Sequence, residues 1–144
     1  AVWRRWALVG SKSGQIVDPG ISSEVVLAHE LTTLTREETL KATADVKIKR
    51  WWVAVPTTAA RSEVLFDGGR RRDRFVFDGG ALEVSAAADW PLNISVQAAG
   101  GGATGRGARG GVPLHLVYEA RDMSLKAGQS ARWRITLKAE GEVR

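Results

Sequence analysis

The chain has 144 residues, of which 44% are hydrophobic and 26% are charged, a composition that excludes a disordered protein and suits one folded domain. It has no cysteine, which excludes disulfides, thiolate nucleophiles and zinc sites built on sulfur. Its formal net charge of +5 favours a polyanionic partner such as RNA, DNA, an anionic membrane or an acidic glycan.

The first segment, residues 1–20, combines apolar and basic side chains. Its apolar stretch contains Arg4 and Arg5, which argues against a signal peptide. No run in the chain reaches the roughly 18 apolar residues of a membrane-spanning helix. We predict a basic and apolar arm over residues 1–20, a single β-sandwich domain over residues 21–144, and no membrane partner.

The first strand expected after this arm is short, from Val25 to His29. The next segment, Thr35 to Ala44, favours a helix of one or two turns. Thr35 and Glu38 have the spacing of a capping box, and the stretch TREETLKA that begins at Thr35 has fair helix propensity. A strand that leads into Val46 is the alternative for this segment.

The following segment, Val46 to Val55, reads VKIKRWWVAV and predicts a strand with one irregularity. Regular alternation would turn Arg50 toward the core. A bulge near Arg50 and Trp51 would instead place Trp51, Val53 and Val55 on the core side. We favour the bulge, because it buries the apolar residues of the strand.

The middle of the chain predicts a three-stranded meander. Phe66-Asp67-Gly68-Gly69 recurs eleven residues later as Phe77-Asp78-Gly79-Gly80, and Asp-Gly between β-favouring runs is a strong hairpin signal. The strands expected are Ser62 to Phe66, Asp73 to Phe77 and Ala81 to Ala86. A calcium site at the paired aspartates is disfavoured, because no further carboxylates cluster nearby in the sequence.

The last strands alternate clearly between apolar and polar residues. They are Pro91 to Gln97, Leu114 to Tyr118 and Ser130 to Glu140, of which the last has a basic outer face. Residues 98–112 contain the run GGGATGRGARGG and predict a long glycine-rich loop between two strands. Eight or nine short strands with Gly-rich turns indicate an all-β fold, either a β-sandwich or a barrel, and we predict the antiparallel β-sandwich.

The motifs of an enzyme are missing from the sequence. His29-Glu30-Leu31-Thr32-Thr33 begins like a zincin helix, but Thr33 stands where the second histidine is needed. The other histidine is His115, and the sequence has neither a nucleophile elbow nor a phosphate-binding loop. We therefore expect no catalytic residues, no metal, no cofactor and no small-molecule substrate.

Tryptophan and arginine supply the candidate binding residues. We assign four of the six tryptophans to a subunit interface in preference to a ligand platform: Trp3, Trp6, Trp51 and Trp52. Arginine pairs well with phosphate and needs no base reading to do so. The candidates for RNA contact are Arg4, Arg5, Lys12, Arg70, Arg71 and Arg72, with Arg106 and Arg109 of the glycine-rich loop as secondary candidates.

The order of these elements resembles the jelly-roll coat proteins of small icosahedral plant RNA viruses, of the tymovirus-like or satellite-virus-like kind. In LTTLTREETLKATADVKIKRWWVAVPTT, a threonine-rich segment leads into a long strand that ends at Pro56, and ARWRITLKAEGEVR is similar to the closing strand of such coats. The resemblance implies a jelly roll of about eight strands and self-assembly into an icosahedral shell. It also implies sequence-independent packaging of RNA in a virion assembled in the host cytoplasm.

Two other classes of protein share this pattern. One is an immunoglobulin-like or carbohydrate-binding β-sandwich of a secreted or cell-surface protein, in which exposed tryptophans would form the ligand platform. The stretch SLKAGQSARWRITL also suits that class. The other is a bacterial pilus or phage structural subunit, which shares the β-sandwich and the assembly. The formation of particles would separate a coat protein from the first alternative.

Overall fold

The computed structural model of the protein describes residues 20–59, 61–98 and 112–141, and these residues form nine β-strands. The strands are β1 (Ile21–Glu30), β2 (Thr33–Ala42), β3 (Val46–Ala59), β4 (Arg61–Asp67), β5 (Arg70–Phe77), β6 (Gly80–Ala88), β7 (Asn93–Ala98), β8 (Val112–Leu125) and β9 (Ser130–Gly141). All the strands predicted from alternation are present, and most of them are longer than predicted.

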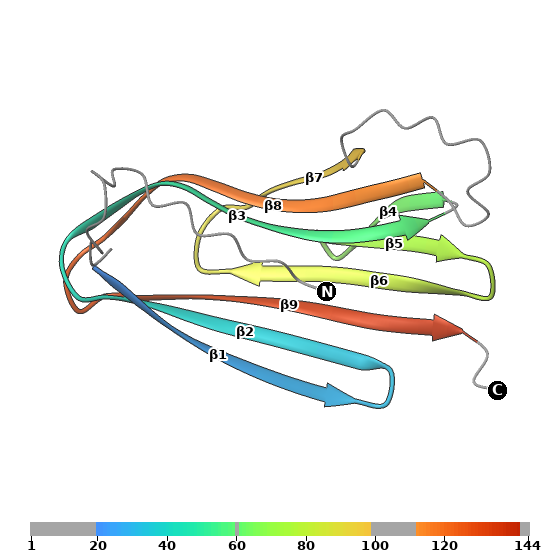
Figure 1. Ribbon diagram of the computed structural model, residues 1–144, viewed down its shortest axis with the longest axis horizontal. Helices are drawn as coiled ribbons and strands as arrows, with labels where there is room; N and C mark the ends of the chain where they lie inside the picture. The colour runs from blue at the N-terminus through green and yellow to red at the C-terminus, as the bar shows by residue number, and fades with distance from the viewer. Residues whose placement is uncertain (1–19, 60, 99–111, 142–144) are drawn as a thin grey trace, which may run out of the picture.

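The strands form two antiparallel sheets that pack face to face (Figure 1). The large sheet has the order β1-β2-β9-β6-β5-β4, and the small sheet has the order β3-β8-β7. The chain passes between the sheets from β2 to β3 and from β8 to β9 at the same end of the molecule. The predicted antiparallel β-sandwich is thus confirmed. Its division into six and three strands does not by itself establish the jelly-roll order, in which about eight strands make up the two sheets.

A cluster of buried side chains joins the two sheets. Trp51 of the small sheet lies edge-on to Trp90, in the connection between β6 and β7, and to Trp133 of the large sheet, with ring centroids 5.1 and 5.0 Å apart. Such edge-to-face pairs stabilise a core by about 0.5–1.5 kcal/mol each beyond the area that they bury. Further members of the cluster are Leu40, Val53, Val55, Phe75, Val84, Leu116, Tyr118 and Ile135.

The helix predicted over Thr35 to Ala44 is wrong, because this segment forms β2. The strand is paired along both sides, with β1 and with β9. Its alternate residues Glu38, Leu40 and Ala42 are buried, as the period of a strand requires. Pairing on both sides outweighs a helix propensity worth roughly a few tenths of a kcal/mol per residue.

A bulge was predicted in β3 near Arg50 and Trp51. The strand does reverse there which of its faces is buried, but without the additional residue that defines a bulge. Ile48 and Trp51 both contact the core, although regular alternation would turn them to opposite faces. The register between β3 and β8 is the same on both sides of Lys49 and Asp122, which do not pair, and Asp122 has a φ of 52°. Both strands therefore change face together. The predicted result holds, because Trp51 and the alternate residues after it are buried.

The predicted meander is confirmed as β4, β5 and β6. Gly68 and Gly69 form its first turn with φ values of 55° and 79°, which suits a two-residue hairpin turn with two left-handed positions. The predicted strands, which ended at Phe66 and began again at Asp73, left Arg70 to Arg72 in the turn region. This run lies on β5 itself, so its side chains alternate between the two faces of the large sheet.

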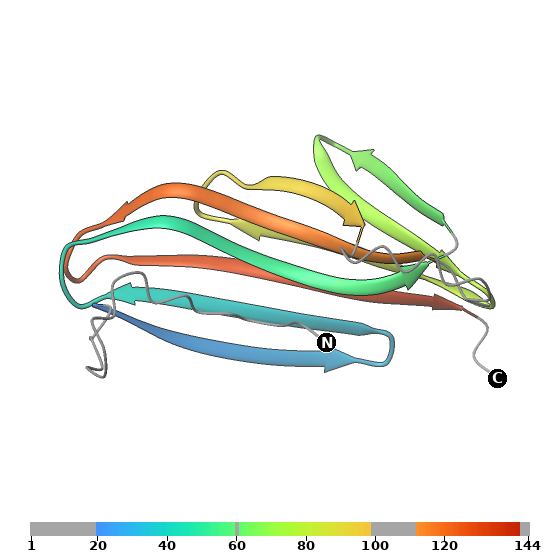
Figure 2. The same ribbon diagram turned by 45° about the horizontal axis from the view of Figure 1, so that its top comes forward.

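The large sheet extends beyond the small sheet at β1, which forms its outermost strand (Figure 2). Nine of the ten residues of β1 are exposed. Among them are three consecutive apolar residues, Val25, Val26 and Leu27, with exposed fractions of 39%, 55% and 65%. Among the described strands, β1 is therefore the terminal strand of the large sheet, and it is apolar at its centre.

Candidate nucleic-acid interface

All the predicted RNA contacts outside the meander lie outside the described residues. These are Arg4, Arg5, Lys12, Arg106 and Arg109, and two of the predicted interface tryptophans, Trp3 and Trp6, lie there as well. The three arginines of β5 and two tryptophans of β3 are described, and the structure assigns different surroundings to each of them.

Arg71 ties the two sheets together inside the sandwich. Its Nε and Nη2 donate to the Asp73 carboxylate at 3.0 and 2.8 Å, and its Nη1 donates to the carbonyl oxygen of Ile94 on β7 at 3.1 Å. The Asp73 side chain is 2% exposed, and its hydrogen bond raises the pKa of Arg71. The hydrogen-bond donors of Arg71 are therefore occupied within the fold, and Arg71 is unsuited to an RNA contact.

Arg72 also forms ion pairs with carboxylates, whereas Arg70 is exposed and forms none in the described part of the chain. Nη1 of Arg72 donates to Glu83 at 2.9 Å, and Nη2 lies 3.9 Å from the Asp67 carboxylate. Arg70 is exposed, and no carboxylate of the described residues pairs with it. Of these three arginines, Arg70 alone has an exposed guanidinium without a carboxylate partner among the described residues, as a phosphate contact requires.

The two tryptophans of β3 point to opposite faces of the small sheet, as their adjacency predicts. Trp51 is only 7% exposed and belongs to the core of its own chain, so its assignment to a subunit interface is wrong. Trp52 lies on the outer face and is partly buried. The guanidinium of Arg50 stacks over its ring, 5.5 Å from the centroid.

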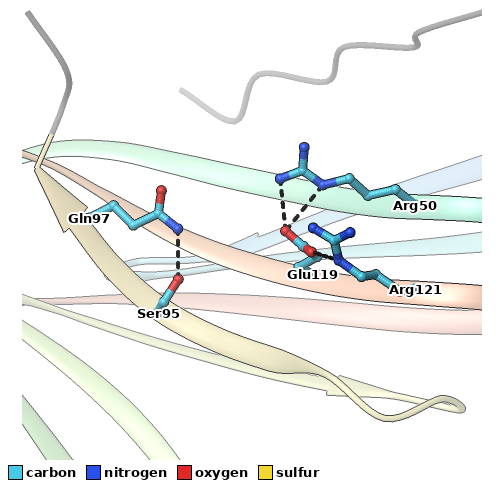
Figure 3. Close-up of polar contacts among 5 residues, drawn as sticks. All are labelled: Arg50, Ser95, Gln97, Glu119 and Arg121. Atoms are coloured by element: carbon cyan, nitrogen blue, oxygen red, sulfur yellow. Dashed lines mark hydrogen bonds and ion pairs between the residues drawn. The ribbon is translucent and has the colours of Figure 1, made fainter.

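Arg50 belongs to a cluster on the outer face of the small sheet (Figure 3). Glu119 of β8 accepts hydrogen bonds from Nε and Nη2 of Arg50 on β3, at 3.2 and 2.8 Å. The second oxygen of the same carboxylate accepts a hydrogen bond from Nε of Arg121, two residues further along β8. We call Arg50, Glu119 and Arg121 the two-arginine site.

The register of the sheet explains this geometry. Arg50 and Arg121 are directly opposite each other, and like charges in that position repel. Glu119 is two residues from Arg121 on β8 and diagonal to Arg50, and its negative charge compensates for the repulsion. Hydrogen bonds, first from Arg50 and then from Arg121, hold the pKa of Glu119 below its usual value. The carboxylate is therefore ionised at neutral pH and fixes both guanidiniums.

The two-arginine site presents cationic donors to solvent and shields its carboxylate. The side chains of Arg50 and Arg121 are 49% and 61% exposed, whereas that of Glu119 is 16% exposed. Nη1 of Arg50 and both Nη atoms of Arg121 donate to no acceptor in the described part of the chain. Two positive charges share one negative charge, so the site keeps a net charge of +1 and unused donors.

Uncharged polar side chains continue this face across β7. Ser95 and Gln97 project on the same side as the two-arginine site, and Gln97 Nε2 donates to the Ser95 hydroxyl at 3.0 Å (Figure 3). Asn93 is opposite Glu119 in the register. Hydroxyls, amides and guanidiniums are the groups that proteins use to contact the phosphates and sugars of nucleic acids.

The large sheet has a comparable trio on its own outer face. Nε and Nη2 of Arg134 donate to Glu37 at 3.0 and 2.6 Å, and Nε of Arg132 lies 3.6 Å from the second oxygen of that carboxylate. Arg132 and Arg134 are 61% and 57% exposed. No aromatic ring of the described residues stacks on either guanidinium. This trio therefore matches the charge of the two-arginine site but lacks its tryptophan.

Sequence reasoning missed Arg121 and did not identify Arg50 as a binding residue. Alternation after the predicted bulge placed Arg50 and Trp52 on one outer face, which was the available signal. Arg121 follows the part of β8 that was predicted as a strand, and its approach to Arg50 depends on a register between distant segments.

No group of three or more His, Asp or Glu side chains in residues 20–59, 61–98 and 112–141 is arranged to hold a metal ion. This includes Asp67 and Asp78 at the meander turns. His29 lies exposed near the end of β1, and His115 lies on β8 between Pro56 and Gln97 in the register. Within the same ranges, no helix has the length and apolar character to span a membrane.

The chain matches no protein-family model, no curated protein and no solved structure.

Proposed function

We propose that the chain is a structural coat subunit that assembles with copies of itself and holds single-stranded RNA by contacts that do not depend on base sequence. The two-arginine site is the observation that carries the RNA contact. An icosahedral shell and a jelly-roll order of the strands belong to this proposal through the resemblance described above.

The chemistry of the two-arginine site suits a phosphodiester backbone. Guanidinium groups bind phosphate oxygens through paired N–H donors, and Glu119 holds both guanidiniums in place before any ligand arrives. The Arg50 guanidinium, stacked on Trp52, also offers its second face to an unpaired base. Such a site binds the backbone and a base plane without reading sequence.

The structure changes which arginines the proposal relies on. Arg71 and Arg72 are paired with carboxylates, and we assign them to the fold. Arg50 and Arg121 take their place, and Arg70 remains a candidate. The candidates outside the described residues, Arg4, Arg5, Lys12, Arg106 and Arg109, stay in the proposal as sequence-based predictions.

The experiment compares two double variants of equal charge. Arg50→Ala/Arg121→Ala removes the two-arginine site, and Arg132→Ala/Arg134→Ala removes the matched trio from the opposite side of the sandwich. Fluorescence anisotropy with a labelled oligo(U) RNA measures affinity over a series of salt concentrations. We expect the first variant to lose about ten-fold or more in affinity, because two charge-assisted contacts are lost.

The salt dependence gives an independent readout of the same contacts. Each phosphate contact with a single strand contributes about 0.7 to the slope of log K against log salt, so losing two contacts lowers the slope by about 1.4. The Arg132→Ala/Arg134→Ala variant should keep most of the affinity and slope of the wild type. Equal losses in both variants would show that general charge, and not the two-arginine site, binds the RNA.

A glycan-binding module is the competing function, because Trp52 and the amides of β7 also lie on this face. A neutral-glycan array and heparin competition separate the two. Tight binding of a neutral glycan that Trp52→Ala removes, with no measurable RNA binding, would contradict the coat proposal.

A further inference from the structure

Of the four edge strands of the described sheets, β1 is the one that lacks the residues that usually protect a strand edge. The large sheet ends at β1 and β4, and the small sheet ends at β3 and β7. Strand edges template pairing with another chain, and proteins protect them with short strands, charged side chains, especially Lys, or Pro. An edge without these features is the place where a second chain can add to the sheet.

Three of these edges carry such protection. β3 contains Lys47, Lys49 and Pro56, β4 contains Arg61 and Asp67, and β7 is only six residues long. β1 is ten residues long and reads ISSEVVLAHE, which has no Lys, Arg or Pro. Its charged residues are two glutamates, Glu24 and Glu30, and its centre is apolar on both faces.

The pairing partner that fits this strand best is a second copy of it. In a two-fold symmetric antiparallel pair, opposite residues lie on the same face of the sheet, so the two opposed positions are both even or both odd. A register centred on Val26 places Val25 opposite Leu27 of the second copy on one face and Val26 opposite its own equivalent on the other. It also places Glu24 opposite Ala28, and Glu30 opposite Ser22.

The neighbouring registers are less favourable. A register centred on Leu27 places Glu24 opposite Glu30 of the second copy, and like charges in that position destabilise a sheet. A register centred on Val25 places Glu24 opposite Val26, which leaves the exposed apolar residues without apolar partners on one face. The sequence of the strand thus selects the Val26 register.

We propose that two copies of this chain pair antiparallel through β1, with Val26 of one copy opposite Val26 of the second, and join their large sheets into one. This contact deepens the proposed function, since it rests on the assembly of the chain with copies of itself and names the surface that the copies share.

The chain has no cysteine, so a single introduced cysteine reports on the contact without a competing thiol. In the Val26→Cys variant, the two Cα atoms would lie about 4.5–5.5 Å apart, which is within the range that a disulfide bridges. We expect mild oxidation of the full chain to give a covalent dimer in high yield. The reduced variant should keep the size and RNA affinity of the wild type.

Two control variants test whether the cross-link depends on the register of the two β1 strands and whether it arises from random collision between copies. Leu27→Cys places the thiols diagonally, about 7–8 Å apart, so it should cross-link at least ten-fold more slowly than Val26→Cys. Ser124→Cys lies exposed on β8, in the small sheet, and measures the rate of collision between copies. Faster cross-linking at Leu27 than at Val26 would overturn the register, and equal rates in all three variants would overturn the β1 contact.

The outcome is separable from that of the proposed function. If the protein assembles with RNA but Val26→Cys cross-links no faster than Ser124→Cys, the β1 contact is wrong and the proposed function stands. If the protein remains monomeric at high concentration in the presence of RNA, both are wrong. Cross-linking of Val26→Cys chiefly to a cysteine at Val64 on β4 would show a head-to-tail pairing of the two edges and would also overturn this proposal.

Discussion

Glu119 determines the geometry of the two-arginine site, because its single carboxylate is bonded to both guanidiniums. Without it, Arg50 and Arg121 would lie opposite each other as an uncompensated like-charge pair. Its shielding, at 16% exposed, also keeps the carboxylate from competing strongly with an incoming phosphate for solvent-facing donors.

The lowered pKa of Glu119 has a testable consequence for pH dependence. A carboxyl whose pKa is lower in the folded state contributes stability that is fully present above its unfolded pKa and is lost as the pH falls through its folded pKa. We expect a carbon-detected NMR titration to show Glu119 ionised at a pH where an ordinary glutamate is protonated. In Arg50→Ala/Arg121→Ala the pKa should move upward, and an unchanged pKa would contradict the described hydrogen bonds.

How far the site follows from the sequence differs between its residues. The outward position of Arg50 beside Trp52 follows from strand alternation together with the predicted bulge, which was favoured because a regular strand would turn Arg50 toward the core. The pairing with Glu119 does not follow, since it depends on a register between residues 69 positions apart. The burial of Arg71 was missed for a similar reason: a run of three arginines at a turn looks exposed until the second sheet covers one face of β5.

At the scale of elements, Arg71 connects β5 of the large sheet to β7 of the small sheet. Replacing it with alanine leaves the Asp73 carboxylate buried without its cation, and we expect a loss of about 3 kcal/mol in the free energy of unfolding. Arg72→Ala breaks an ion pair that is about one-third exposed on the arginine side and should cost less than about 1 kcal/mol.

Urea denaturation followed by tryptophan fluorescence measures both changes, because the buried tryptophans lie in the core between the sheets. Both variants should retain the m-value of the wild type. A small, equal loss in the two variants would mean that Arg71 is not a tie between the sheets and would return it to the candidates for RNA contact.

Alternation between apolar and polar residues predicted most of the strands but not their partners. Ser130–Gly141 is recognisable because Trp133, Ile135 and their alternate neighbours form one face. The segment of β2 was misread because its TREET sequence has a capping-box spacing, whereas its strand state comes from pairing with β1 and β9. The local sequence shows the alternation that identifies a strand, but the order of the strands in a sheet depends on contacts between segments far apart in the chain.

At the scale of the whole molecule, the two sheets have different sizes, and this leaves two kinds of surface. The small sheet presents the two-arginine site on its outer face, and the described part of the large sheet ends at β1, whose centre is apolar and exposed. A subunit that holds a polyanion on one face and pairs with its own copies along an edge has what an assembly around RNA requires.

The central claim, that the chain assembles with copies of itself around RNA, is tested most directly by the size of the purified protein. Multi-angle light scattering and electron microscopy of the full chain, at high concentration and with single-stranded RNA added, measure it. We expect particles far larger than a dimer that contain RNA and that dissociate or release RNA at high salt. A protein that remains monomeric in both conditions, with no particles in the micrographs, would contradict the account.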